Sequence, residues 1–507
     1  MAQTVYRANL SSKSFPFISE NFGQSVIVGG PDQNFSRQVV SAEDQDKDIG
    51  IPQIYYCHNI MPLASGFQSV GYTGILPFVP SVNDFEKIYL LRDPDANLAY
   101  LGVRANGDFW VSDGTGTAWV YKLLGIADRL ITIGVVAGVT YIYRERNGCY
   151  KYNFGTGAFD AVPLAGITAT NVIGICDSSG YLIAWTSTTV AWSSTLDPTD
   201  FVPSSVTGAG GGSVEEVKGS IKYCVPHTMG FIVGATDNCV AAIAQSNTLY
   251  PFQYRELVGS GGLSSLDLIS YDANTIGLYA YTTAGLQLIN IQQTQTVFPE
   301  VTDFISGRYF EDFDDYFKTF THQILTAPMQ KAVSVVCERY LVISYGLAEL
   351  THALVYDLVM KRWGKLKTPH VQVFTYTLPA AGITEAPKQT FALLKNDGSV
   401  VVVDFSITAP TSRGTLLLGK YQHVRSRLLQ LDMIDLECVR QNQTFDLTVL
   451  TAIDGKNTVN NSPELLYDTG LTREYGCRTT GTNHSLLLQG GFTVNSLVLR
   501  FNVHGKR

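Results

Sequence analysis

The sequence repeats one short pattern: a run of strand-forming residues, a tight turn, and a second such run. The turns centre on pairs such as Asn106-Gly107 and Asp397-Gly398. These pairs favour two-residue hairpins, because both central positions tolerate positive φ. A hairpin that recurs down a long chain, without helices between copies, predicts a toroidal all-β scaffold. Five copies occupy residues 102–111, 141–152, 173–185, 278–289 and 391–402.

The composition supports strands over helices. Charged residues make up 16% of the chain, against a typical value of about 25%. Tyrosine (27) and phenylalanine (25) are abundant, and aromatic residues are enriched in strands. At 507 residues the chain is too long for one ordinary core, so we expect two or three domains.

Three regions differ in character along the chain. Residues 1–60 lack a clear pattern, carry a polar run at 41–48, and predict an irregular N-terminal arm. Residues 61–410 hold the hairpins and predict an irregular propeller of six or seven blades, since a blade takes about 40 to 50 residues. Residues 411–507 hold alternating strands and predict a separate C-terminal β-sandwich. The expected fold class is therefore all-β.

One window favours a helix. Phe310, Phe313, Phe317, Phe320 and Ile324 recur at helical spacing. We expect an insertion here that packs on the propeller rim, and the alternative is a docking helix for a partner subunit.

Residue patterns that carry chemistry are weak. The glycines of 208–213 lack the following Gly-Lys-Ser/Thr of a phosphate-binding loop, so we expect a flexible loop. The acidic run 44–50 lacks the spacing of a calcium loop. Residues 112–119 resemble a sialidase Asp-box but lack one residue of it, and an ordinary turn is expected. Cys57 and His58 alternate on an expected strand, so their side chains point to opposite faces.

No catalytic, cofactor-binding or metal-binding residue is therefore predicted, and we do not expect an enzyme. A carboxylate pair for glycoside hydrolysis stays open, because the fold and not the sequence sets the distance between such groups.

Charge and cysteine content narrow the expected binding partners and cellular compartment. The formal net charge of −8 argues against a protein that grips nucleic acid through basic patches. It is compatible with a wall past which DNA slides. The eight cysteines form no CxxC pair, which favours free thiols in a reducing compartment. The N-terminus lacks an apolar signal core, and no apolar run is long enough to predict a transmembrane helix.

Several stretches, in this order, resemble the tail nozzle (tail tubular B-like, DNA-stabilisation-type) proteins of short-tailed bacteriophages. The central stretch begins at Trp192 and holds Pro198, Asp200 and Phe201. The stretches are 59–66, 192–201, 217–221, 247–252, 361–366, 425–427, 434–437 and 452–455.

The resemblance implies a structural virion protein of the tail, made in the host cytoplasm, with no catalytic residues. It implies a ring of six copies below the tail adaptor, with tail fibres or spikes as neighbours. Genomic double-stranded DNA would be held in the channel of this ring and ejected through it, without sequence-specific binding.

Two alternatives remain. A propeller that binds or hydrolyses glycans would need arginines or paired carboxylates clustered on one face. A cellular kelch-type scaffold would need regular repeats with double glycines, and the sequence holds only one approximate repeat, around 339–364.

Overall fold

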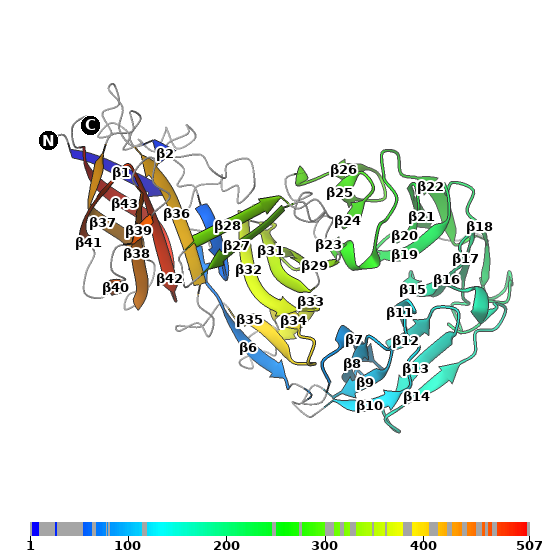
Figure 1. Cartoon of the computed structure of the whole chain (residues 1–507). Helices are drawn as coiled ribbons and strands as arrows, with labels where there is room; N and C mark the ends of the chain where they lie inside the picture. Colours follow the sequence, from blue (N-terminus) through cyan, green and yellow to red (C-terminus); the bar gives the residue numbers. More distant parts are fainter. Residues whose placement is uncertain are drawn as a thin grey trace.

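The structure is a computed structural model built almost entirely of β-strands and turns (Figure 1). Among the residues it describes there is no α-helix, and the helical elements are two short 3-10 turns, η3 (Ala169–Asn171) and η4 (Leu266–Leu268). The described residues are 3–9, 26–27, 54–62, 67–77, 79, 82–113, 119–245, 250–272, 276–299, 309–314, 319–324, 331–346, 349–359, 362–378, 388–404, 414–422, 428–438, 444–452, 459–461, 465–468 and 474–503.

Four-stranded antiparallel units succeed one another around a common centre, which makes this part of the fold propeller-like (Figure 1). We number them sheets 1 to 7 in chain order. Sheet 1 contains β7 (Phe85–Arg92), β8 (Leu98–Arg104), β9 (Phe109–Ser112) and β10 (Val120–Leu123). Sheet 2 contains β11 (Ile131–Val136), β12 (Val139–Arg144), β13 (Gly148–Asn153) and β14 (Ala158–Val162). Sheet 3 contains β15 (Gly174–Ser178), β16 (Tyr181–Trp185), β17 (Thr189–Trp192) and β18 (Gly210–Ser213).

Sheets 4 to 7 follow the same plan. They are β19 (Ile221–His227), β20 (Gly230–Ala235), β21 (Cys239–Ala244) and β22 (Phe252–Glu256); β23 (Ile269–Asp272), β24 (Gly277–Thr282), β25 (Gly285–Ile289) and β26 (Thr294–Thr296); β29 (Lys331–Cys337), β30 (Tyr340–Gly346), β31 (Leu350–Asp357) and β32 (Arg362–His370); β33 (Gln372–Leu378), β34 (Lys388–Leu394), β35 (Val400–Asp404) and β6 (Gly71–Leu76).

All five predicted hairpins are present in these sheets. Their turns differ from the predicted type at most positions. At Asn106-Gly107 only the glycine has positive φ (80°). The Gly107 N–H donates to Arg104 O and the Arg104 N–H to Asp108 O, which is a type I turn followed by a bulge. At Asp397-Gly398 likewise only the glycine has positive φ (80°), whereas Ser179-Gly180 in the 173–185 hairpin has positive φ at both residues (51° and 84°).

The second strands of the sheets are buried on both faces. In β20 (Gly230–Ala235) every residue is buried, because each sheet packs between its two neighbours. This accounts for near-continuous apolar runs such as 230–235, where a sheet with one wet face would alternate.

The ring is closed by a strand from early in the chain. β6 pairs antiparallel with β35, from Gly71↔Asp404 to Leu76↔Val400. Beside this seam the Trp119 indole N–H donates to Gly398 O over 2.9 Å. The Phe85 and Trp119 rings lie 5.2 Å apart. A Cβ at Gly102 would lie 2.4 Å from the Phe85 ring, so glycine is required there by close packing.

Outside the ring, strands from both ends of the chain share two sheets. β43 (Thr493–Val503) pairs with β37 (Leu429–Cys438) on one side, and with β1 (Gln3–Asn9) and β5 (Phe67–Ser69) on the other. β36 (Gly414–Gln422) pairs with β42 (Asn483–Gly490), β3 (Ile54–His58) and β2 (Val26–Ile27). The remaining strands are β4 (Ile60–Pro62), β38 (Thr444–Ala452), β39 (Val459–Asn461), β40 (Leu465–Asp468) and β41 (Glu474–Gly481).

One apolar cluster joins these two sheets. It holds Leu416 and Leu488 from one sheet and Leu431, Leu499 and Phe501 from the other. This arrangement corrects the expected irregular arm: within residues 1–60 the described strands β1, β2 and β3 pair with strands from beyond residue 411. No local turn signal marks such pairing, so the sequence pattern could not reveal it.

The predicted helix at 310–324 is wrong. β27 (Tyr309–Asp314) and β28 (Thr319–Ile324) form an antiparallel hairpin, with Phe313 opposite Phe320. Phenylalanine and threonine have higher strand than helix propensity, and that preference outweighs the helical spacing. Whether this segment contacts a partner stays a prediction.

Trp119 and Trp110 allow a matched test of the seam. Both rings contact Phe85, but Trp110 Nε1 has no hydrogen-bond partner in the described structure. We expect Trp119→Phe to lower the free energy of unfolding by about 1–3 kcal/mol, through the lost hydrogen bond and ring contact. Trp110→Phe should cost less, because it removes an unsatisfied donor. Denaturant unfolding of both variants measures this, and equal costs would contradict the role of the Gly398 bond.

Two buried histidines predict acid sensitivity. His370 Nε2 lies 2.8 Å from Ser344 Oγ, and His484 Nε2 lies 2.9 Å from Leu429 O. Burial lowers the pKa of each imidazole from 6.5 to about 4. Between these values the unfolded chain binds protons that the folded chain does not, so stability should fall as pH drops from about 6.5 to 4. We expect His484→Gln to make the free energy of unfolding depend less steeply on pH, as measured by denaturant unfolding across that range. An unchanged pH dependence would contradict this role of His484.

Candidate functional site

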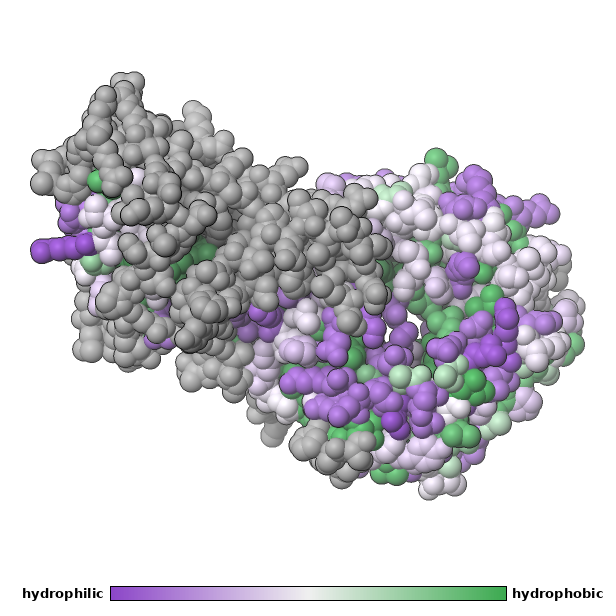
Figure 2. All heavy atoms as spheres, in the orientation of Figure 1, coloured by the Kyte–Doolittle hydropathy of each residue, from purple (hydrophilic) through white to green (hydrophobic). Residues whose placement is uncertain are grey.

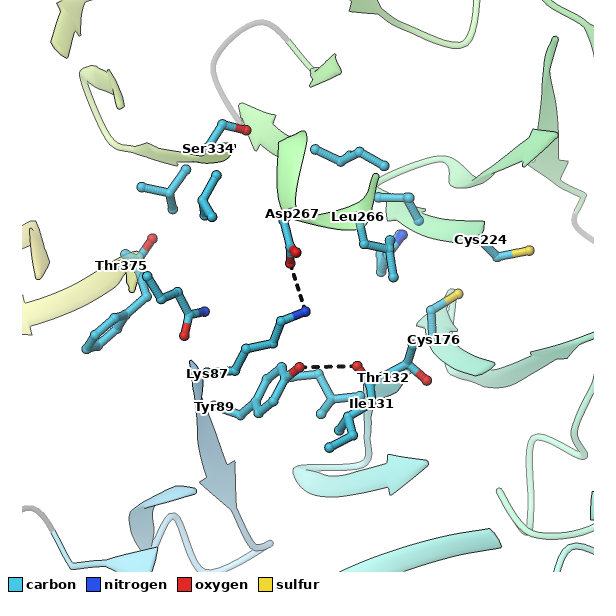
Figure 3. A pocket seen from close by; sticks show the side chains of 18 of the residues that line it. Lys87, Tyr89, Ile131, Thr132, Cys176, Cys224, Leu266, Asp267, Ser334 and Thr375 are labelled. Carbon is cyan, nitrogen blue, oxygen red and sulfur yellow. Dashed lines mark hydrogen bonds and ion pairs between the residues drawn. The ribbon is translucent and has the colours of Figure 1, made fainter. Parts of the chain in front are cut away.

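The inner strands of the seven sheets enclose a central cavity of ≈ 320 Å³. Every sheet contributes to its lining, as Figure 3 shows for the labelled side chains. Figure 2 shows the opening at the middle of the ring, with hydrophilic residues around it. Lining residues that matter below are Lys87, Tyr89, Thr132, Cys176, Cys224, Asp267, Ser334 and Gln372.

Most polar side chains of the lining join neighbouring sheets. Tyr89 Oη donates to Ile131 O over 3.1 Å, and Thr132 Oγ1 accepts from the Ile175 N–H over 2.8 Å. Gln372 Oε1 accepts from the Ile88 N–H. Further links between adjacent sheets are Ser178 Oγ–Gly230 O, His227 Nε2–Ile276 O, Ser270 Oγ–Ser334 Oγ and Thr375 Oγ1–Val336 O. At least one such hydrogen bond therefore crosses each of the seven junctions.

One ion pair crosses the cavity between sheets that are not neighbours. Lys87 Nζ on β7 lies 2.9 Å from Asp267 Oδ1 on η4 (Figure 3). Burial alone would lower the pKa of the Lys87 ammonium, but Tyr89 and Asp267 reverse this and raise the pKa above its usual range. The Ser265 hydroxyl accepts from the Asp267 N–H over 3.2 Å and holds η4 in place. Lys87 therefore stays charged and paired across the neutral range.

The thiols of the lining are not poised as nucleophiles. Burial raises the pKa of Cys176 and of Cys224 well above the ordinary value, and the thiolate is the reactive form. Asp267 is the one carboxylate in the lining, whereas glycoside hydrolysis commonly uses two. The polar groups of this cavity hold the ring together through the bonds described above.

The size of the cavity excludes one use. Its volume of ≈ 320 Å³ is that of a pocket for a small molecule. Duplex DNA, whose major groove alone is about 12 Å wide, cannot pass through it.

The residues singled out from the sequence lie apart from this cavity. Gly210–Ser213, expected as a flexible loop, is β18, the outer strand of sheet 3. Of the Asp-box-like stretch, Ser112 ends β9 and Trp119 packs at the seam, and residues 114–118 lie outside the described residues. The acidic run 44–50 also lies outside them. Cys57 and His58 are both buried at the end of β3, and burial raises the pKa of the Cys57 thiol to about 12.

Lys365 is a titratable residue that the sequence reasoning missed. It lies on β32, opposite Ile60 of β4, where sheet 6 continues into the strands outside the ring. Its side chain is almost fully buried (1% exposed), near Cys57. Burial lowers the pKa of its ammonium from 10.5 to about 7. Arg362-Trp363-Gly364-Lys365 reads as an ordinary strand segment, and the structure places Lys365 between β31 and β4.

Two features are absent from the described part of the chain. No group of three or more His, Cys, Asp and Glu side chains converges there to hold a metal ion. No helix in these residues has the length and apolarity needed to span a bilayer.

Comparison with known proteins finds similarity only to solved structures. No family model and no curated protein matches the sequence. YCF48 bound to D1 peptide is 10% identical, with a TM-score of 0.38 over 66% of this chain and 96% of that chain. The designed protein Ika8 (10%, 0.39, 65% and 98%) and Sqt1 of Saccharomyces cerevisiae (10%, 0.35, 68% and 99%) are similarly distant. At these values the comparison bears on neither family nor function.

Lys365→Met tests the buried lysine. Between pH 7 and 10.5 the unfolded chain binds a proton that folded Lys365 does not, so the cost of burying this lysine is full below pH 7 and shrinks as pH rises. We expect the variant to be more stable by roughly 1–4 kcal/mol at or below neutral pH, with the gain narrowing toward pH 10. Denaturant unfolding at several pH values measures the gap. A variant that is less stable at every pH would show that Lys365 is net stabilising.

Proposed function

We propose that the chain is a structural subunit of a tail nozzle in a short-tailed bacteriophage. Copies of it would assemble as a ring, below the tail adaptor and beside fibres or spikes, in the virion tail. The channel of that ring would retain double-stranded genomic DNA and conduct it into the host, without catalysis by this subunit.

One structural observation carries this proposal beyond the sequence resemblance. Sheet 6 of the propeller-like ring continues through β4 and β5 into β43, β37 and β41 as one ten-stranded sheet. At the joint the Ser69 N–H donates to Phe492 O, and the Phe492 N–H donates to Ser69 Oγ, each over 2.9 Å. A sheet that is bonded through both parts suits the wall of an assembly that must resist force.

The finer features of the fold belong to the same proposal. We interpret the seven sheets as seven blades of an irregular β-propeller. We interpret the two sheets built from the chain ends as a sandwich that includes residues from the N-terminal segment. Because the cavity inside one subunit is too small for duplex DNA, the DNA channel would lie between copies. The net charge of −8 would help DNA slide along such a wall.

The ring can be tested on the purified full-length chain. We expect mass photometry at micromolar concentration to show a species of about six times the 55.5 kDa chain mass, and negative-stain electron microscopy to show rings with a central opening. The DNA flanking the coding sequence should encode portal and adaptor proteins.

Other results would count against the nozzle assignment. A chain that stays monomeric at every concentration, also after mixing with the adaptor encoded beside it, would refute the nozzle assignment. So would a flanking region without virion genes. Specific binding of one glycan class on an array would instead favour the glycan-binding alternative.

A further inference from the structure

One arginine is buried between sheets 1 and 2 with half of its guanidinium unbonded. Arg144 ends β12 and is 3% exposed. Its Nη1 donates to Leu124 O over 2.9 Å, but its Nε and Nη2 are buried and have no hydrogen-bond acceptor among the described residues. Burial lowers the pKa of this group, yet an arginine stays charged in proteins. Because buried charges are normally paired, two N–H groups of Arg144 lack the acceptor that their burial calls for.

Two aromatic rings lie against this guanidinium without supplying that acceptor. The Arg144 Cζ is 4.1 Å from the centre of the Phe109 ring and 5.2 Å from the centre of the Tyr150 ring. The Tyr150 hydroxyl lies close to the guanidinium, but it is neutral and donates to Asn147 Oδ1 over 2.9 Å. The rings attract the charge through their π faces. Nε and Nη2 remain, and together they form a side of the planar fork that binds an oxyanion through two parallel bonds.

The carboxylate that acts on Arg144 is engaged elsewhere. Asp108 interacts with the Arg144 charge, but its Oδ1 accepts from the Gly125 N–H over 2.6 Å and its Oδ2 from Asn106 Nδ2 over 2.8 Å. Arg104 Nη1 lies 3.8 Å from the same Oδ2. Within the described residues no ion pair joins Arg144 to any carboxylate. The protein therefore positions this guanidinium and leaves its bidentate side to another group.

The sheet leaves room beside Arg144. Gly148 on β13 pairs with Arg144, and residues directly opposite each other on neighbouring strands share one face of the sheet. A Cβ at Gly148 would meet no atom within 4 Å. The φ of Gly148 is not positive, so its backbone does not require glycine. The effect of glycine at this position is to leave open space on the face that carries Arg144.

We propose that Arg144 Nε and Nη2, on the face shared with Gly148, bind a small monovalent anion such as chloride or formate. The anion supplies the acceptor that the two buried N–H groups lack. A free ion is favoured over a carboxylate of another chain, because a side chain could not reach atoms that are buried from solvent. Through the bond from Arg144 to Leu124 O, the bound ion helps to hold the segment that links β10 to β11.

Recognition of the anion does not depend on a basic surface. Arg104 pairs with Asp84, and the charges of Arg104 and Arg144 together balance those of Asp84 and Asp108. The surroundings therefore do not attract anions over a distance. Selectivity rests on two aligned N–H donors in a buried site, where a hydrogen bond is electrostatically stronger than in water. Weak binding is expected, so its effect should emerge as the salt concentration rises.

Stability in different salts tests the site on the full chain. At constant ionic strength, with sodium gluconate and its bulky anion as the reference, chloride or formate should stabilise the fold. Each tenfold increase above the dissociation constant should raise the folding equilibrium constant about tenfold, as measured by denaturant unfolding. Arg144→Met should abolish this rise. Arg255→Met is the matched control and should keep it, because Arg255 also donates to a carbonyl of the next sheet, that of Ile291.

Bromide locates the ion in the unchanged chain, so this measurement needs no variant to fold. In crystals of the full-length protein grown in sodium bromide, we expect an anomalous peak within hydrogen-bond distance of Arg144 Nε and Nη2. Density there without an anomalous signal would assign the position to water and overturn the proposal. A folding constant that ignores chloride, or that responds equally in Arg144→Met, would also overturn it, as would loss of the response in Arg255→Met. None of these outcomes bears on the nozzle proposal, which is tested by the ring itself.

Discussion

The ring depends on the antiparallel pairing of β6 with β35. Every other sheet of the ring forms from neighbours in sequence, but sheet 7 needs a strand from before sheet 1. The entropic cost of closing so long a loop grows slowly, by about 0.6 kcal/mol for each doubling of length. Five backbone pairings and the packing of Phe85, Trp119 and Gly398 beside the seam can therefore offset it. Because these contacts are non-local, slow folding is expected.

Polar side chains near the centre also help to close the ring. A hydrogen bond at each junction joins a side chain of one sheet to the next, and each contributes about 0.5–1.5 kcal/mol. Such bonds use groups, among them Tyr89, Thr132 and Gln372, that a binding site would need free. The cavity keeps one charged pair, Lys87 and Asp267, which also spans the ring. The central site is thus built chiefly for closure, which agrees with a structural role.

Local features of the fold could be predicted from the sequence, and long-range ones could not. The hairpins at 102–111 and 391–402 carry glycine at the one turn position that needs positive φ, so their existence was evident, though the turn type was not. The hairpin β27–β28 was mistaken for a helix because five apolar residues happen to recur at helical spacing, and the pairing of the two strands follows the strand propensity of the residues instead. The partners of β1 and β3 lie beyond residue 411, and nothing in residues 1–60 specifies them. The burial of Lys365 could not be predicted either, because its neighbour Ile60 on β4 is far away in the sequence.

The joint between the ring and the paired chain ends sets how force would pass through the subunit. The ten-stranded sheet links the two parts by backbone pairing from β32 through β4 and β5 to β43. These links are short but continuous: one residue pair joins β32 to β4, and two pairs join β5 to β43, beside the Ser69–Phe492 bonds. A load applied to β43 therefore reaches sheet 6, and from there the two neighbouring sheets through Ser270–Ser334 and Thr375–Val336.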